Sequence, residues 1–183
     1  MDRSALERLG QIKLRALDWF QDGLWLLLRG WWGFQFAQAG YGKLMNLERP
    51  TEYFATLGIP APKLNAILAG ATECFGGALL AVGLLSRPAG LGLSFTMAVA
   101  YATAHREELL GLFRKPDAFT EAAPFLFLVV SLLVVAHGPG MLSLDALLVR
   151  LLRERVRPVY LALLVGRSTA ERILGHPVSE SAS

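Results

Sequence analysis

Apolar residues along the chain fall into four long runs that short polar segments separate. The runs cover about residues 23–42, 64–86, 88–105 and 119–138. A helix rises about 1.5 Å per residue, so about 20 apolar residues span roughly 30 Å, the thickness of a bilayer's hydrocarbon core. The pattern predicts an all-α integral membrane protein in which four transmembrane helices form an antiparallel bundle. Only Ser86-Arg87-Pro88 separates the second run from the third, so these two helices should form a hairpin.

Both flanks of this predicted bundle have amphipathic helical patterns. Within residues 1–22 and 146–175, leucines recur at helical spacing, and the polar face of each predicted helix is rich in arginine. We expect two amphipathic helices at the cytoplasmic surface of the membrane, on either side of a transmembrane domain over 23–145. The C-terminal extension is also a candidate docking segment for other subunits. The last residues, 176–183, should form a disordered tail.

Between the fourth run and the C-terminal extension, glycine and proline predict a sharp turn. Gly138-Pro139-Gly140 ends the run, and Ser143 stands directly before the next helical pattern. A serine at that position typically caps the helix by accepting a hydrogen bond from a backbone N–H of its first turn. This motif is therefore expected to be structural.

The composition agrees with a membrane protein. Of 183 residues, 54% are apolar and 18% are charged, against roughly 25% charged in an average soluble domain. This excludes intrinsic disorder and disfavours an ordinary soluble globule. The net charge is +3, but the basic residues flank the apolar runs, so a lipid bilayer is the expected partner and nucleic acid is not.

The distribution of Lys and Arg predicts the orientation in the membrane. If both termini share a side, that side holds eleven of the 18 Lys and Arg residues, the other side holds six, and Arg29 lies within the first run. The positive-inside rule then places both termini in the cytoplasm of a multi-pass inner-membrane protein. The first run follows a charged segment and contains Arg29, so we interpret it as a retained helix and not as a cleaved signal peptide.

Two ionisable residues, Arg29 and Glu73, lie deep within the apolar runs. Arg29 is about 9 Å from the inner end of its helix, and Glu73 is near mid-depth. Glu73 shares its helical stripe with small residues such as Gly70 and Gly77, so it should lie on a packing face. Either the two groups neutralise each other as a structural pair, or Glu73 is a proton carrier or ligand group in a cavity.

A second set of polar residues lies at the predicted outer ends of the helices. Lys43 ends the first run, Tyr101 and His105 end the third on one face, and Glu121 opens the fourth. Around one mouth of the bundle these side chains could hold an anion or a quinone headgroup. Alternatively they are the interfacial anchors that membrane helices commonly carry at their ends.

The histidines and the cysteine do not predict a metal centre. Cys74 is the single cysteine, which excludes an internal disulfide and a cysteine-ligated cluster. His105 and His137 fall at opposite ends of the bundle, a membrane thickness apart, so they should not share a ligand. We therefore expect no metal or haem on this chain.

Taken together, these motifs resemble the DoxX family over about residues 24–147. The residues that carry the resemblance are Arg29-Gly30, Gly40-Tyr41-Gly42-Lys43-Leu44, Phe54-Ala55, Leu57-Gly58-Ile59-Pro60, Glu73, Gly76-Gly77, Gly83-Leu84-Leu85-Ser86-Arg87, Ala100–His105, Glu121, Gly138-Pro139-Gly140 and Ser143-Leu144-Asp145. The resemblance implies a small four-helix inner-membrane protein. Family members include the membrane subunit of an archaeal thiosulfate:quinone oxidoreductase and a mycobacterial component of a membrane oxidoreductase complex.

The resemblance and the polar residues lead to three functional hypotheses. The first is a membrane subunit of a quinone-linked oxidoreductase, with Arg29 and Glu73 as the catalytic pair lining a cavity. The quinone would then be held by the outer-end residues, which are Lys43, Tyr101, His105 and Glu121. The second is a non-catalytic accessory subunit that stabilises a larger membrane complex through its amphipathic flanks. The third is a small-solute or proton carrier.

Overall fold

The structure is a computed structural model that describes residues 3–152, 158–175 and 177–178. Over these residues all regular secondary structure is helical, as the sequence predicts. The ten described helices are α1 (Arg3–Met45), α2 (Glu48–Thr56), α3 (Pro62–Val82), α4 (Ser86–Thr103), α5 (Arg106–Leu110), α6 (Pro116–Glu121), α7 (Pro124–His137), α8 (Leu144–Leu152), α9 (Pro158–Val165) and α10 (Arg167–Leu174).

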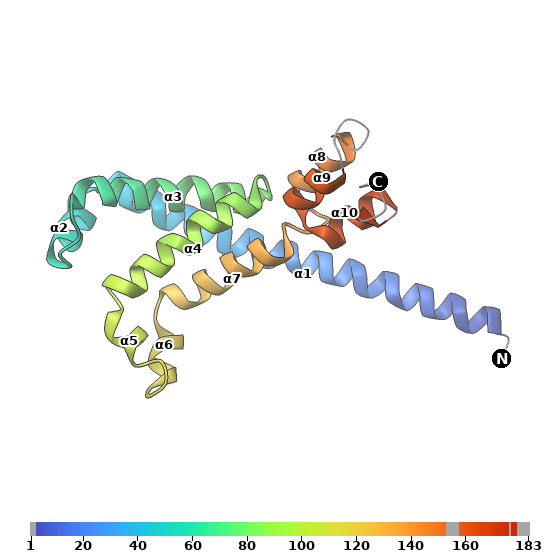
Figure 1. The fold of residues 1–183 in the computed structure, drawn as a ribbon, viewed down its shortest axis with the longest axis horizontal. Coiled ribbons are helices and arrows are strands. Elements are labelled where there is room, and N and C mark those ends of the chain that lie inside the picture. The colour runs from blue at the N-terminus through green and yellow to red at the C-terminus, as the bar shows by residue number, and fades with distance from the viewer. Residues whose placement is uncertain (1–2, 153–157, 176, 179–183) are drawn as a thin grey trace.

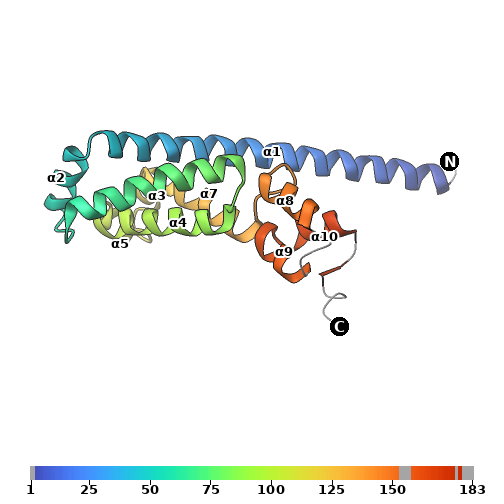
Figure 2. The ribbon, with the colours of Figure 1, turned by 90° about the horizontal axis from the view of Figure 1, so that it is seen from above.

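Helix α1 is a single helix of 43 residues that runs along one side of the molecule (Figures 1 and 2). It contains both the first predicted span and the N-terminal segment, so residues 3–22 are not a separate helix. The first proline of the chain is Pro50, and glycines alone do not end a helix, so nothing in the sequence interrupts it. The N-terminal half extends beyond the bundle and passes α8–α10 (Figure 2).

Small residues set the register between α1 and α3, which form the most extensive helix pair of the described chain. A Cβ atom added to Gly33 would lie 2.5 Å from the backbone nitrogen of Ala81, and one added to Gly40 would lie 2.5 Å from the carbonyl oxygen of Gly70. Only glycine lets the two backbones approach this closely. The small-residue packing face predicted around Glu73 is confirmed, and the contacts fix which residues stand opposite each other.

The connection between α3 and α4 falls slightly earlier than predicted. Helix α3 ends at Val82, its C-cap Gly83 has a φ of 74°, and Ser86 already begins α4. The connection is therefore residues 83–85, while Ser86-Arg87-Pro88 forms the first turn of α4. Asp145 stabilises this start, because its carboxylate accepts hydrogen bonds from the backbone nitrogens of Leu85 (2.8 Å) and Ser86 (2.9 Å).

The fourth predicted span, 119–138, is divided between α6 and α7. Ala122 has an extended ψ of 136°, and α7 begins at Pro124. Proline has no N–H for the carbonyl four residues earlier, and its ring collides with that carbonyl, so a helix from 119 cannot continue unbroken. With 14 residues, α7 is about 21 Å long.

By length and apolar composition, α3 alone among the described helices could cross a membrane, and α7 is apolar but shorter. The four-span arrangement therefore stays a prediction. The described helices of the bundle share a core that contains Phe36, Leu80, Leu93, Met97 and Val134.

Helices α8–α10 form a second, smaller unit at one end of the bundle. Its core contains Val149, Leu161, Val165, Ala170 and Val178. The predicted turn and cap are confirmed, because Ser143 Oγ accepts a hydrogen bond from the backbone nitrogen of Ala146 (3.1 Å) at the start of α8. Apart from Pro177 and Val178, the tail predicted to be disordered lies outside the described residues.

Candidate functional site

At the end of the bundle that carries α2, a cavity of about 440 Å³ lies among α1, α2, α3, α4 and the start of α7. We call it the apolar pocket, because most of its wall is aliphatic and aromatic. Polar side chains join the wall at a few points, namely Lys43, Asn65, Thr72, Glu73, Thr96, Thr103 and His105. A mostly apolar cavity with a few polar groups is the usual form of a small-molecule site.

The main polar feature of the apolar pocket is an ion pair between Lys43 of α1 and Glu73 of α3. The Lys43 ammonium group donates a hydrogen bond to Oε2 of Glu73. The Glu73 side chain is 3% exposed, while that of Lys43 is 33% exposed. Gly70 makes room for this arrangement, because a Cβ there would lie 3.3 Å from the Cβ of Lys43. The buried carboxylate therefore has a cation that reaches it from the edge of the bundle.

His105 lines the same pocket from the end of α4. Its φ of −118° marks the break between α4 and α5. Its Nδ1 lies 3.5 Å from Oε1 of Glu108, so a protonated imidazole would be paired with that carboxylate. The ring packs edge-on against Tyr101, with 6.1 Å between the ring centroids.

A second cavity, of about 710 Å³, adjoins the first beneath α2. Its wall includes Asn46, Arg49 and Glu52, so we call it the polar pocket. Lys43 lines both cavities, together with Ala39, Pro50 and Tyr53. The Lys43–Glu73 pair thus stands where an apolar cavity meets a polar one.

Arg29 is not part of this site, and the predicted pair of Arg29 with Glu73 is not formed. The Arg29 guanidinium, in a residue only 1% exposed, donates hydrogen bonds to the carbonyl oxygens of Pro139 (2.5 Å) and Leu142 (2.9 Å). The register explains the difference. Arg29 precedes Gly40 by about three turns, roughly 16 Å along the axis, so it lies at the level of Gly83 and not of Glu73.

Tyr101 and Glu121 also lie outside both pockets. Tyr101 is buried, donates its hydroxyl hydrogen bond to the Phe119 carbonyl (2.7 Å) and stacks on the Phe119 ring at 4.6 Å. This contact holds α6 against α4. Glu121 is exposed at the end of α6. Of the six predicted site residues, the structure brings together Lys43, Glu73 and His105.

Sequence reasoning missed the part of the wall that α2 supplies. Tyr53, Phe54 and Leu57 close the apolar pocket from the side of the α1–α3 connection. This helix is only nine residues long and too short to appear among the apolar runs. Its aromatic residues in an otherwise polar connection were the available signal.

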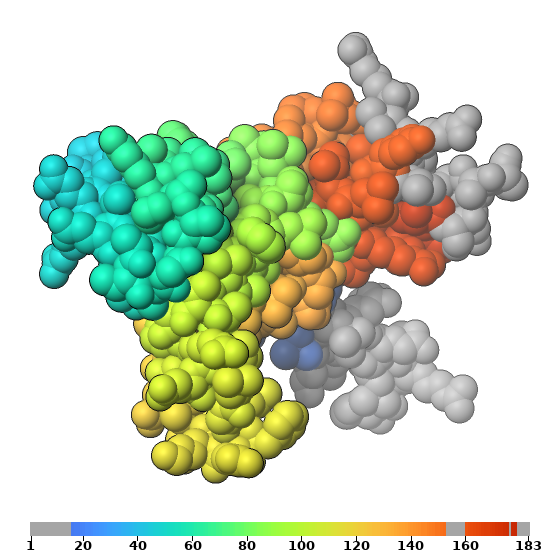
Figure 3. All heavy atoms as spheres, turned by 60° about the vertical axis from the view of Figure 1, so that its left-hand side comes forward, coloured from blue at the N-terminus to red at the C-terminus, as the bar shows by residue number. Residues whose placement is uncertain are grey.

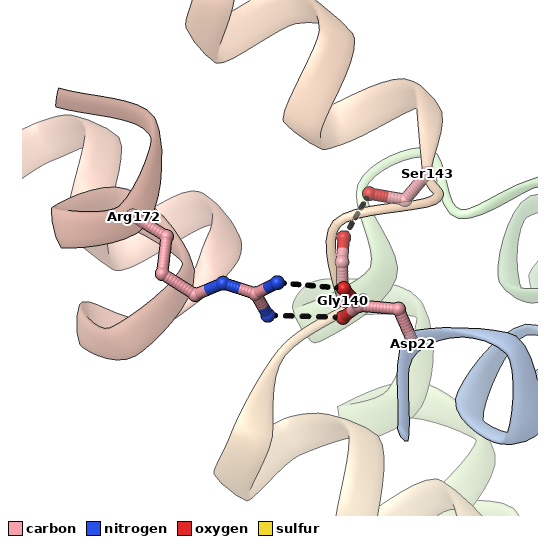
Figure 4. A network of polar contacts seen from close by, with 4 residues as sticks. All are labelled: Asp22, Gly140, Ser143 and Arg172. Carbon is pink, nitrogen blue, oxygen red and sulfur yellow. Dashed lines mark hydrogen bonds and ion pairs between the residues drawn. The ribbon is translucent and has the colours of Figure 1, made fainter. Parts of the chain in front are cut away.

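The opposite end of the bundle holds a polar network that sequence reasoning also missed. Arg172 of α10 donates hydrogen bonds from both terminal nitrogens to the carboxylate of Asp22 on α1, at 3.1 and 2.8 Å. The hydrogen bond with Asp22 raises the pKa of Arg172 above its ordinary value. Figure 4 shows this pair beside the hydrogen bond from Ser143 to the Gly140 carbonyl (2.7 Å). The contact of Arg172 with Asp22 fastens α10 to α1, while the Ser143 hydrogen bond stabilises the turn before α8.

In the part of the chain that the structure describes, no three His, Cys, Asp or Glu residues gather in a way that could hold a metal ion. The site is therefore best described by its ion pair, its imidazole and its apolar wall.

Comparisons with known proteins place this site within a family. The DoxX sequence profile matches residues 24–106, a stretch that contains Lys43, Glu73 and His105. Inner membrane protein YphA of Escherichia coli (strain K12) is 31% identical over 107 residues, which are 58% of this chain and 76% of that protein. No solved structure matches the chain at a significant level. The chain belongs to the DoxX family of membrane proteins.

Proposed function

We propose that this chain is the membrane subunit of a quinone-linked oxidoreductase and that the quinone binds in the apolar pocket. The observation that carries the proposal is the buried Lys43–Glu73 pair at the edge of a mostly apolar cavity of about 440 Å³. This volume lies within the range of roughly 300–1,000 Å³ that is usual for small-molecule sites.

The donor set of the pocket fits a quinone ring. Such a ring has two carbonyl oxygens and apolar faces, and when bound it supplies two-electron, two-proton chemistry. The Lys43 ammonium group would donate a hydrogen bond to one oxygen, and the Glu73 carboxylate would take up or return a proton. His105 is a second titratable group on the pocket wall. In this proposal the electrons are exchanged with a redox centre on a partner subunit.

The proposed placement in the inner membrane has α1, α3, α4 and α7 as the spanning helices and both termini in the cytoplasm. The N-terminal end of α1 and the unit formed by α8–α10 lie at the same end of the molecule, which supports an even number of passes (Figure 2). The apolar pocket then lies near the outer face. Arg87, Arg150, Arg167 and Arg172 would all lie on the cytoplasmic side, as the positive-inside rule requires.

Purification in a mild detergent, followed by extraction and quantification of bound quinone, tests the proposal. We expect quinone with the wild-type chain and with Glu121→Gln, because Glu121 lines neither pocket. Glu73→Gln should lower the retained quinone by about tenfold while the helical content stays unchanged. A wild-type chain that neither retains quinone nor binds added quinone would rule the function out.

A non-catalytic accessory subunit is the second candidate, and the surface of α8 favours it. The side of α8 opposite Asp145, Ala146 and Val149 is apolar and exposed, and it consists of Leu144, Leu147, Leu148, Leu151 and Leu152. Replacing Leu148 and Leu151 with glutamate should release partner subunits that co-purify with the wild type. Unchanged co-purification would contradict this function. A small-solute or proton carrier, the third hypothesis, requires pH-dependent flux in liposomes.

A further inference from the structure

The apolar pocket opens sideways between α3 and α4. Several of its lining side chains are also exposed on the outside of the bundle, among them Leu68 of α3 and Phe95 and Val99 of α4. Phe95 is 71% exposed. A wall residue that is exposed in this way belongs to the rim of an opening, and these three come from two neighbouring helices.

The packing of α3 against α4 explains why the opening lies there. A Cβ on Gly76 would lie 3.3 Å from Cγ of Leu93, and one on Gly92 would lie 3.4 Å from Cγ2 of Thr72. These contacts hold the helices together near their connection. Towards the α2 end the two helices diverge (Figure 1), and in Figure 3 the α2–α3 part lies above the α4–α6 part.

We call this opening the α3–α4 slot and define it by the pocket-lining residues on its two sides, Leu68, Thr72, Phe95, Thr96 and Val99. Three of the five are apolar, and the two threonines offer hydroxyl groups. Thr96 donates its hydroxyl hydrogen bond to the Gly92 carbonyl (3.0 Å) within its own helix, so that hydroxyl is already satisfied. The slot therefore presents a surface that suits a hydrocarbon chain.

The charges inside the pocket constrain the other end of the ligand. Lys43 and Glu73 neutralise each other, and a protonated His105 would have Glu108 beside it. A ligand with a net charge would find no unpaired counter-charge among these groups, and burying such a charge is costly. A neutral headgroup with hydrogen-bonding oxygens could instead interact with both members of the Lys43–Glu73 pair.

We infer that the pocket binds a neutral-headed amphiphile whose head lies at the Lys43–Glu73 pair and whose hydrocarbon tail leaves the bundle through the α3–α4 slot into the lipid. The identification of the head as a quinone rests on the proposed function. The path of the tail rests on the slot, and the neutrality of the head rests on the paired charges of the pocket. A ligand of this kind enters and leaves from the membrane and never has to cross water.

The inference is tested with two quinones that have the same head, one with an isoprenoid tail and one without a tail. Their binding to the full chain in nanodiscs is measured for the wild type and for two variants. Val99→Trp and Leu68→Trp add bulk on the two sides of the slot. We expect the wild type to bind the tailed form about tenfold or more tightly than the tailless form, because each buried methylene of the tail contributes to affinity. Each variant should abolish this preference while it changes tailless binding by less than about threefold.

Matched controls come from the same two helices. Phe75→Trp on α3 and Leu91→Trp on α4 alter exposed apolar residues that do not line the pocket, so both should keep the wild-type preference. If the slot variants leave the preference intact, or weaken tailed and tailless quinones equally, the tail does not pass through the slot and the inference is wrong. Tighter binding of a fatty-acid anion than of the neutral tailed form would contradict the neutral head.

A wild type that binds no quinone would overturn the proposed function. The path of the tail would then be tested separately, with a ligand that is not a quinone. A photoactivatable monoacylglycerol, which is neutral and carries no quinone, is then cross-linked to the protein. Cross-links to peptides containing Leu68 or Val99 that Val99→Trp removes would support the slot. Cross-links that lie elsewhere, or that Val99→Trp does not change, would overturn it.

Discussion

The ammonium group of Lys43 on α1 donates a hydrogen bond to the carboxylate of Glu73 on α3, and the pair stands between the apolar pocket and the polar pocket. One partner is almost completely buried and the other reaches the edge of the bundle. The energetics of the pair therefore bear on both stability and the proposed function.

The position of Lys43 over Glu73 depends on the close approach of the α1 and α3 backbones at Gly40. A methyl group added at this position should therefore disturb the helix pair. In Gly40→Ala the new Cβ would overlap the backbone of α3 at Gly70 and Cys74, so the helices must separate. We expect a loss of about 1–3 kcal/mol in the free energy of unfolding. Denaturant unfolding in detergent, followed by tryptophan fluorescence, measures it.

Gly42→Ala is the matched control for this substitution. It lies on the same helix, but nothing stands within 4 Å of its added Cβ. Removing a helical glycine there should leave the stability unchanged or raise it by up to about 1 kcal/mol. Equal stability of the two variants would show that α1 and α3 do not pack in this register.

Substitution of Arg29 should have a different effect from substitution of Glu73, because Arg29 contacts the turn at the other end of the bundle. Arg29→Met removes the donors of the Pro139 and Leu142 carbonyls and should cost about 2 kcal/mol or more. Hydrogen exchange should rise at the start of α8 and at the α3–α4 connection, while the apolar pocket keeps its ligand. Arg114→Met, at an exposed arginine, is the control and should change neither.

If Arg29→Met removed quinone while the exchange of α8 stayed slow, Arg29 would have a role in ligand binding that its contacts do not explain.

The positions of Lys43 and Glu73 show which features of helix packing the periodicity of the sequence can predict. The sequence predicted that Glu73 lies on a small-residue packing face, because residues three and four apart share a face of a helix. The structure confirms this, since Gly40 and Gly70 flank the pair. Periodicity describes the angle around a helix and leaves the sliding of one helix along another undetermined. For this reason the packing face of Glu73 was predicted correctly, whereas the pairing of Glu73 with Arg29 was wrong.

The other misses have local or long-range causes. The prediction of one span over 119–138 relied on its hydropathy and did not allow for Pro124. Proline breaks a helix, so α7 begins there. Asp22 and Arg172 are separated by 150 positions, and no pattern in the sequence connects them. That contact exists only because α8–α10 fold back against α1.

The next prediction concerns the contribution of the Asp22–Arg172 pair to the docking of α10 on α1. Its two hydrogen bonds are parallel, but the Arg172 side chain is 40% exposed, so the pair should contribute only about 1 kcal/mol. Asp22→Asn should speed the proteolysis or hydrogen exchange of α10, and the double replacement Asp22→Arg with Arg172→Asp should restore part of the protection.

Arg167→Gln is the control for docking, because Arg167 pairs with Glu171 inside the same helix and has no ion pair with another helix among the described residues. It should leave the protection of α10 unchanged. The effect of Asp22→Asn should shrink at high salt, because partly exposed charges are screened. A charge reversal that restores nothing would show that Asp22 does not meet Arg172 in solution.

The last prediction concerns the cost of breaking the Lys43–Glu73 pair. Lys43→Met leaves a buried carboxylate without its cation, and such a loss costs about 3 kcal/mol. Replacing both residues, as in Lys43→Met with Glu73→Leu, removes the buried charge as well, so the double variant should be more stable than Lys43→Met alone.

A double-mutant cycle from denaturant unfolding, completed with Glu73→Leu, measures this coupling at pH 7. If Lys43→Met were as stable as the double variant, Lys43 would not stabilise a buried Glu73 carboxylate in solution, and the proposed site would lose the ion pair on which it rests.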